Sequence, residues 1–161
     1  MFDAALLAQA RILLDAARRK GVHIATAESC TGGLIAATLT AIAGSSDVVD
    51  RGFVTYSNDA KTDLVGVPPD LIAAHGAVSE PVARAMAEGA VARSLADLSI
   101  SVTGVAGPGG GSAEKPVGLV WFGCARRGAP TISEHRIFPG DRSDVRRATV
   151  VHALHLLRSR I

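Results

Sequence analysis

Ser29 is the residue whose type and surroundings most clearly suggest chemistry. It lies in the sequence TAESCTGG (residues 26–33), between a short apolar stretch that predicts a buried strand and an apolar run that predicts a helix over residues 34–43. A serine at such a junction presents its hydroxyl at the edge of a sheet, beside backbone N–H groups that lack partners within the helix. Those groups can bind an oxyanion or a phosphate, as in the nucleophile elbow of hydrolases. The alternative is that Ser29 only caps the helix.

Cys30 and the histidines are the other candidates for nucleophilic or metal chemistry. A thiolate is intrinsically a better nucleophile than a serine, but neighbouring side chains point in different directions, so we predict that Cys30 is a small buried residue at the helix start. The five histidines are scattered along the chain. His152 and His155 share a helix face without acidic residues nearby in the sequence, which argues against a metal site. We therefore expect neither a metal nor an organic cofactor.

The composition of the chain argues for a globular domain and against several other classes of protein. The chain has 161 residues, of which 48% are hydrophobic and 20% charged, values typical of a single globular domain over residues 1–161. The net charge is +2 and 4% of the residues are aromatic, which argues against nucleic acid as a partner. Two cysteines provide neither a disulfide framework nor a four-ligand metal set. We see no signal peptide and no apolar run long enough to cross a membrane, and expect a cytoplasmic protein.

Helical and strand patterns alternate along most of the chain. Helices are expected over residues 6–20, 34–43, 57–65, 70–74, 82–95 and 145–158, and strands over residues 22–25, 52–56, 98–103, 117–125 and 131–138. A short turn at residues 126–128 joins the last two strands, which predicts that they pair as a hairpin. The pattern predicts an α/β fold, with a three-layer α/β/α sandwich around a mixed, mostly parallel central sheet.

A series of short motifs in a fixed order gives the chain a family resemblance. They are similar to those of the CinA C-terminal domain family and read TAESCTGG (26–33), AGSS (43–46), RGFVTYSN (51–58), HGAVSEP (75–81), GVAGP (104–108), KPVG (115–118) and GDR (140–142). The resemblance extends over nearly the whole chain. Many members of the family carry an additional N-terminal domain that resembles molybdopterin-binding proteins, and we expect this chain to lack it.

The resemblance implies a reaction and a set of catalytic residues. Members of the family act as nicotinamide-nucleotide amidohydrolases, which convert nicotinamide mononucleotide to nicotinate mononucleotide and ammonia and are linked to NAD recycling. Matched position by position, Ser29 is the nucleophile, Lys61 its general base and Tyr56 an assisting residue. The implied partner is a small pyridine nucleotide.

Elementary chemistry is consistent with these assignments. An amide is a poor electrophile and a neutral serine is a weak nucleophile, so a base must accept the Ser29 proton. Lysine can do so only where burial or neighbouring cations lower its pKa, and Ser–Lys pairs occur as variants of the serine triad. On position alone, Lys61 could instead be a solvated helix lysine, and Tyr56 a core aromatic residue with its hydroxyl at the rim.

A nucleotide also requires groups that bind its phosphate and ribose. Glycine-rich backbone at helix starts can bind phosphate without a lysine. Our candidates from the backbone segments are the elbow residues Cys30, Thr31, Gly32 and Gly33, the turn residues Gly44, Ser45 and Ser46, and the loop residues Gly104, Ala106 and Gly107. The alternative for the loop is a flexible surface segment.

Four side chains complete the predicted substrate-binding set. Thr103, at a strand end, could bond the amide or the ribose, and Asn58 follows the strand that ends near Tyr56. Arg142 and Arg146 are four residues apart on one face of the last helix and could supply positive charge. A solvated helix face explains the two arginines equally well.

Two other functions fit the sequence. One is a non-catalytic nucleotide-binding or interaction module of the competence or damage-inducible type, although such a module has no need for a nucleophile with a base. The other is an amidase for a different small amide. We also expect a homo-oligomer, because the apolar first helix and the strand around Trp121 could bury surface in a dimer.

Overall fold

A five-stranded sheet forms the middle layer of the computed structural model, which describes residues 2–161. Its strand order is β2–β1–β3–β4–β5, and β1 is the strand that leads to Ser29. The strands are β1 (Ile24–Glu28), β2 (Val49–Val54), β3 (Leu98–Gly104), β4 (Leu119–Arg126) and β5 (Ile132–Ile137). The central strands β1 and β3 are buried on both faces, which explains their almost continuous apolar or small-residue sequences.

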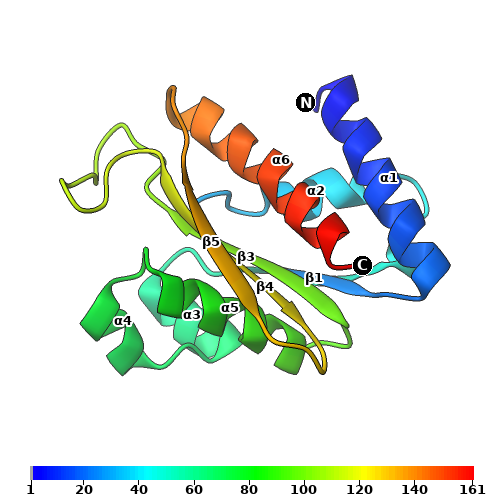
Figure 1. The fold of residues 1–161 in the computed structure, drawn as a ribbon, viewed down its shortest axis with the longest axis horizontal. Helices are drawn as coiled ribbons and strands as arrows, with labels where there is room; N and C mark the ends of the chain where they lie inside the picture. Colours follow the sequence, from blue (N-terminus) through cyan, green and yellow to red (C-terminus); the bar gives the residue numbers. More distant parts are fainter. Residues whose placement is uncertain (1) are drawn as a thin grey trace.

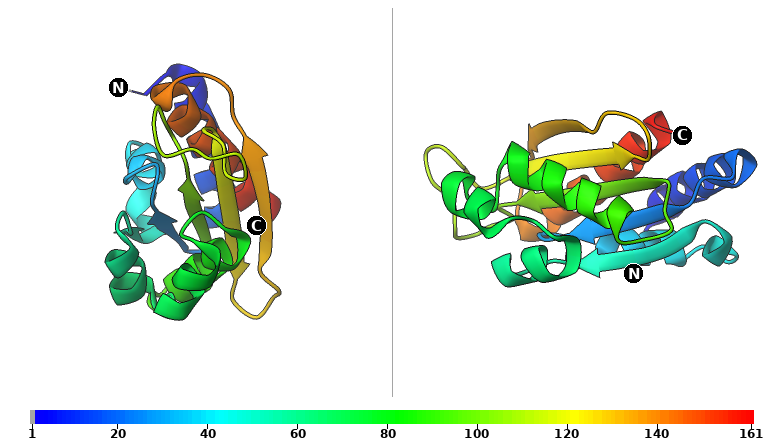
Figure 2. Two further views of the ribbon diagram at one scale, coloured as in Figure 1. Left: turned by 90° about the vertical axis from the view of Figure 1, so that its left-hand side faces the viewer. Right: turned by 90° about the horizontal axis from the view of Figure 1, so that it is seen from below.

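Helices cover both faces of the sheet (Figure 1 and Figure 2). The helices are α1 (Ala4–Lys20), α2 (Leu34–Thr40), α3 (Asn58–Val65), α4 (Pro69–His75), α5 (Glu80–Ala92) and α6 (Arg142–Ser159), with a 3₁₀ turn at Ser45–Asp47. One core cluster joins α1, α2 and α6 to their face of the sheet, and a second joins α3, α4 and α5 to the opposite face. The predicted three-layer α/β architecture is therefore observed. No helix within residues 2–161 is long and apolar enough to cross a membrane.

The prediction of a mostly parallel sheet is wrong. Strand β1 pairs in parallel with β2 and with β3, whereas β4 pairs antiparallel with both β3 and β5. The physical reason is the connection: no helix separates β3 from β4 or β4 from β5, so the chain reverses directly instead of crossing over. The sheet is mixed, with its parallel half on the side that carries Ser29.

The parallel half brings three segments to one edge of the sheet. Strands β1, β2 and β3 end at Glu28, Val54 and Gly104, and Glu28 is in register with Val54 and Val102. Strand β1 extends three residues beyond its predicted end, because both neighbouring strands continue to pair with it. Ligands bind outside the carboxyl ends of strands in open α/β sheets, so this edge is where a site is expected.

Close packing of two helices positions Lys61 near that edge. Helix α3 carries Lys61 in its first turn and packs against α5. Gly89 of α5 allows this approach, because a Cβ there would overlap the carbonyl oxygen of Val65, the last residue of α3. A side chain at position 89 would push the two helices apart.

We predict that Gly89→Ala lowers the free energy of unfolding by about 2 kcal/mol or more, since overpacking outweighs the gain of about 1 kcal/mol in helix propensity. Urea denaturation measures the change. Gly109→Ala is the matched control, because a Cβ at Gly109 has no atom within 4 Å. A stabilised Gly89→Ala variant would contradict the close approach of α3 and α5.

Candidate active site

A cavity of about 220 Å³ lies at the carboxyl edge of β1, β2 and β3. It is lined by Ser29, Cys30, Tyr56, Asn58, Lys61, Ala77, Val78, Thr103, Gly104, Ala106 and Arg142. The structure therefore gathers residues from five separate parts of the chain, and most of them belong to the set selected from the sequence.

Ser29 and Lys61 contact each other directly in this cavity. The Lys61 Nζ donates to Ser29 Oγ over 3.2 Å and to the carbonyl oxygen of Thr55 over 2.9 Å. The lysine side chain is almost completely buried, with a relative exposure of 1%. Removal from water disfavours the ammonium form and lowers the pKa of Lys61 below its ordinary value, although the nearby Cys30 acts in the opposite direction. Lys61 is thus no solvated helix lysine.

The start of α3 fixes the position of Lys61 on the chain. Ser57 is the N-cap, and its Oγ accepts from the N–H of Ala60 over 3.0 Å. Its carbonyl oxygen accepts from the N–H of Lys61 over 3.2 Å. Lys61 is therefore placed in the first helical turn, with its side chain directed back toward the sheet edge.

The elbow itself is a tight turn that requires glycine. Gly32 and Gly33 have φ values of 58° and 101°, in the left-handed region that other residues rarely adopt. The N–H of Gly32 donates to the carbonyl oxygen of Ser29, and the N–H of Gly33 donates to the carboxylate of Glu28. Within residues 2–161, the N–H groups of Cys30 and Thr31 have no such acceptor. The elbow donors left for an oxyanion are therefore these two and not those of the glycines.

Tyr56 and Arg142 form a pair at the mouth of the cavity. Arg142 donates to the hydroxyl of Tyr56 over 3.0 Å and to the carbonyl oxygen of Gly107 over 2.9 Å. Tyr56 is 60% exposed and lies beyond the end of β2, so it is no core aromatic residue. Its hydroxyl is engaged by Arg142 and not by Ser29 or Lys61.

Arg146 lies behind the elbow instead of facing the cavity. Its guanidinium donates to the carbonyl oxygens of Cys30 and Thr31 over 3.1 and 3.0 Å. Thr103 does line the cavity, and its hydroxyl donates to the carbonyl oxygen of Ala77 over 2.8 Å. The two arginines that looked equivalent in the sequence therefore have different surroundings.

The turn at Gly44, Ser45 and Ser46 lies away from the cavity. It precedes β2, whose first residue, Val49, is in register with Ile24 at the opposite end of β1 from Ser29. The carbonyl oxygen of Gly44 is near Arg18 of α1. The chain does not bring this turn to the other candidate residues.

Cys30 is buried, as predicted. Its side chain is 6% exposed, and burial raises the pKa of its thiol to about 12. A thiol with such a pKa is almost entirely protonated near neutral pH and is a poor nucleophile. Ser29 is therefore the better-placed nucleophile of the elbow.

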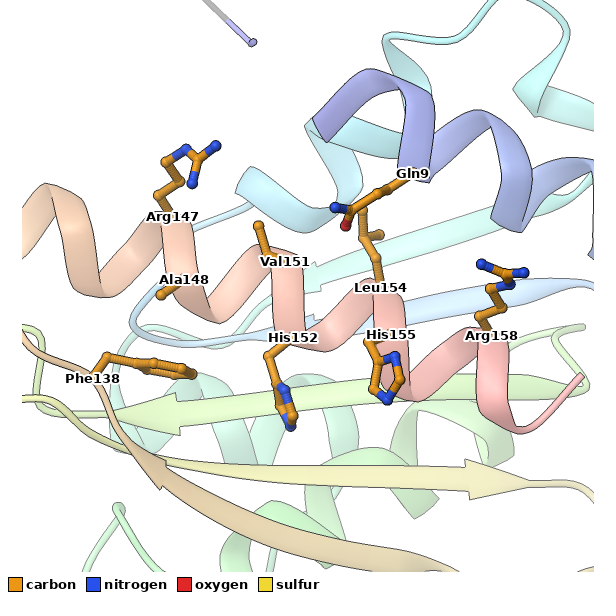
Figure 3. Close-up of a pocket in the computed structure, with 9 residues that line it drawn as sticks. All are labelled: Gln9, Phe138, Arg147, Ala148, Val151, His152, Leu154, His155 and Arg158. Carbon is orange, nitrogen blue, oxygen red and sulfur yellow. The ribbon is translucent and has the colours of Figure 1, made fainter. Parts of the chain in front are cut away.

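A hollow larger than this cavity has less convergent chemistry. It is a groove of about 590 Å³ along α6, facing α1, and is lined by Gln9, Phe138, Arg147, Ala148, Val151, His152, Leu154, His155 and Arg158. Figure 3 shows its two arginines at opposite ends of the groove, with both histidines directed toward the strands. His152 does have an acidic partner, Glu134, contrary to the expectation from sequence. Residues 2–161 nevertheless contain no group of three or more potential metal ligands.

Comparison with known proteins places the chain in a family. The model of the CinA C-terminal domain matches residues 7–161. The chain belongs to the CinA C-terminal domain family. It is 48% identical over 157 residues to the nicotinamide-nucleotide amidohydrolase PncC of Escherichia coli, and the match covers 98% of this chain and 95% of that protein.

Other relatives in the CinA family are longer or have solved structures. A CinA-like protein of Mycolicibacterium gilvum is 58% identical over 143 residues, but the chain spans only 34% of that protein's length. The crystal structure of a competence/damage inducible protein from Agrobacterium tumefaciens matches with a TM-score of 0.95 and 49% identity, over 99% of this chain and 97% of that one. The fold of the family is thus shared over the whole chain.

The sequence alone indicates no role for Glu28, although Glu28 lies inside the TAESCTGG motif of this CinA domain. The carboxylate is fully buried and accepts five hydrogen bonds, described below. The available signal was a charged residue at the end of an otherwise uncharged strand. Such a residue is rarely buried unless it is paired or well bonded.

We predict that neither cysteine reacts with Ellman's reagent in the folded protein at about pH 8, and that both react in urea. Burial raises the pKa of each thiol to about 12 and blocks access to it. The Cys124→Ala variant assigns any residual signal to Cys30. A fast-reacting thiol at Cys30 in the folded state would reinstate it as a rival nucleophile.

Proposed function

We propose that this CinA domain hydrolyses the carboxamide of nicotinamide mononucleotide to nicotinate mononucleotide and ammonia, with Ser29 as nucleophile and Lys61 as general base. The observation that carries the proposal is the 3.2 Å contact between Lys61 Nζ and Ser29 Oγ at the end of a cavity. The identity of the substrate is inferred from the similarity to the E. coli enzyme over nearly the full length of both chains.

Acylation would begin at the amide carbon. Ser29 Oγ forms a bond to this carbon while the neutral amine of Lys61 accepts the hydroxyl proton. The amide oxygen becomes an oxyanion, next to the N–H groups of Cys30 and Thr31. The Lys61 ammonium then donates its proton to the departing nitrogen. Ammonia leaves, and an ester between Ser29 and the nicotinoyl group remains.

Deacylation would use the same groups in reverse order. Lys61, neutral again, accepts a proton from a water molecule as its oxygen attacks the ester carbon. The tetrahedral intermediate collapses, the C–O bond to Ser29 breaks, and Lys61 returns the proton to Ser29 Oγ. The product is nicotinate mononucleotide, whose carboxylic acid then loses its remaining proton to solvent and becomes the carboxylate.

The size of the cavity indicates how the nucleotide would lie. Ligand pockets commonly measure roughly 300–1,000 Å³, so a cavity of about 220 Å³ holds the amide end and leaves part of the nucleotide outside. The exposed pair Tyr56–Arg142 at the mouth would supply a positive charge for the phosphate. Thr103 and Asn58, both in the lining, would bond the amide or the ribose.

A homo-oligomer is part of the proposal. The two edge strands leave apolar side chains in solvent: Val54 at the end of β2 is 48% exposed and Ile137 at the end of β5 is 59% exposed. Covering such residues is a common reason for symmetric association. Light scattering coupled to size-exclusion chromatography would measure the mass, and a monomer at micromolar concentration would rule the oligomer out.

We predict that wild-type protein, freed of metal by chelation, releases ammonia from nicotinamide mononucleotide, and that Ser29→Ala reduces kcat by at least about 1,000-fold. Ammonia is measured with a coupled enzymatic assay. Cys124→Ala is the matched control, because Cys124 is buried in β4 and does not line the cavity. A Ser29→Ala variant with normal turnover would exclude the covalent mechanism.

We predict that kcat/KM rises with pH through the pKa of Lys61, and that this rise occurs below 10.5, the ordinary value for lysine, because burial favours the neutral base. Lys61→Met should lose activity by about 100-fold or more at every pH. The exposed Lys20, at the end of α1, provides the control: Lys20→Met should keep both the activity and the profile. The assignment fails if Lys61→Met retains the wild-type profile.

A further inference from the structure

Glu28 is a completely buried carboxylate directly before the proposed nucleophile, and it is absent from the lining of the cavity. Five groups donate to it. They are the hydroxyls of Thr26 (3.1 Å) and Thr31 (2.6 Å) and the N–H groups of Gly33 (3.2 Å), Ile35 (2.9 Å) and Ala36 (2.8 Å). A buried charge is tolerated where it is fully hydrogen bonded, and this one is.

The carboxylate acts as the missing cap of α2. The first N–H groups of a helix have no partners inside it, and a capping side chain normally satisfies one of them. The N-cap of α2 is Gly33, which has no side chain. Glu28 satisfies three of these N–H groups from the preceding strand. Helix α2 has seven residues and is too short to be stable without such support.

Arg146 stabilises the opposite side of the elbow. Its guanidinium accepts nothing and donates to the carbonyl oxygens of Cys30 and Thr31. The elbow thus lies between an anion and a cation. The Glu28 carboxylate accepts hydrogen bonds from N–H groups at the start of α2, and the Arg146 guanidinium donates to the elbow carbonyl groups. Charge-assisted hydrogen bonds of this kind are the stronger ones and fix geometry.

We propose that Glu28 is a positioning residue for the reaction: together with Arg146 it clamps the elbow so that Ser29 Oγ stays within hydrogen-bond distance of Lys61 Nζ. Without the clamp, the glycine turn and the first turn of α2 can shift by more than the few tenths of an ångström that nucleophile and base tolerate. The expected loss of kcat rests on the proposed function. The expected displacement of Ser29 Oγ from Lys61 Nζ does not.

The variant Glu28→Gln tests this proposal with little change of shape. Oε1 accepts from Thr26 and Ala36, and Oε2 accepts from Thr31, Gly33 and Ile35. An amide nitrogen in either position therefore faces two or three donors and cannot accept from them. We expect kcat to fall about 10- to 100-fold, with KM changed by less than about threefold, because substrate contacts are retained and alignment is lost.

Two further variants separate positioning from stability. Leu98→Ala removes a core side chain at the far end of the sheet, where Leu98 is in register with Ile24, and should lower Tm without lowering kcat at 25 °C. Thr31→Val removes one donor and keeps the carboxylate charge, and should lower kcat by about three- to tenfold. It also provides the test if Glu28→Gln does not fold.

Lysine NMR provides a readout that needs no substrate. The chain has three lysines, Lys20, Lys61 and Lys115, so ¹³C-labelled lysine gives a spectrum in which Lys61 is readily assigned. If the elbow is released, water reaches the amine and the titration midpoint of Lys61 moves upward toward its ordinary value in Thr31→Val and in Glu28→Gln.

Should wild-type protein fail to hydrolyse nicotinamide mononucleotide, the proposed function falls and this shift alone decides the role of Glu28. Unchanged kcat, or an unchanged Lys61 titration, would overturn the proposal.

Discussion

The exclusion of water from one lysine amine is the constraint on which the site depends. Lys61 is buried, and its Nζ donates to two acceptors, Ser29 Oγ and the carbonyl oxygen of Thr55. Burial disfavours the charged form, so the amine is suited to accept a proton. Several elements contribute to this burial or to these two contacts. Helix α3 carries the lysine, α5 supports α3 at Gly89, and the segment after β2 provides the Thr55 carbonyl group.

The parallel and antiparallel halves of the sheet have different roles. Its parallel half, β1, β2 and β3, directs three chain segments to one edge, where the cavity lies. Its antiparallel half, β4 and β5, extends the core between α5 and α6 and completes the face on which α6 packs. Helix α6 then returns to the edge of the sheet with Arg142 and Arg146. The half without site residues therefore supports the helix that completes the site.

Much of the fold and part of the site could be predicted from local sequence. The elbow and the α/β class depend on short motifs and on strand-to-helix order, which are local features. The pairing of Ser29 with Lys61, 32 residues apart, was expected only from the resemblance to the CinA family. Strand direction in the second half of the sheet depends on which connections lack a helix, and the mostly parallel prediction missed this. Glu28 received no role, and Arg146 was expected at the substrate and not at the elbow, because the partners of both are defined only by the folded turn. Arg146 lies 116 residues from Cys30 along the chain.

Helix α6 is synthesised long after the elbow, so the contacts between them form late in synthesis. The helix occupies Arg142–Ser159, almost the end of the chain, yet its arginines bind the elbow and the Tyr56 hydroxyl. Until α6 has been synthesised, the nascent chain contains the nucleophile and the base, but the elbow carbonyl groups and Tyr56 have no guanidinium partners. These contacts therefore form only after α6 has emerged and docked. A chain that loses its C-terminal helix, through truncation or premature termination, loses the support of a turn that was translated more than a hundred residues earlier.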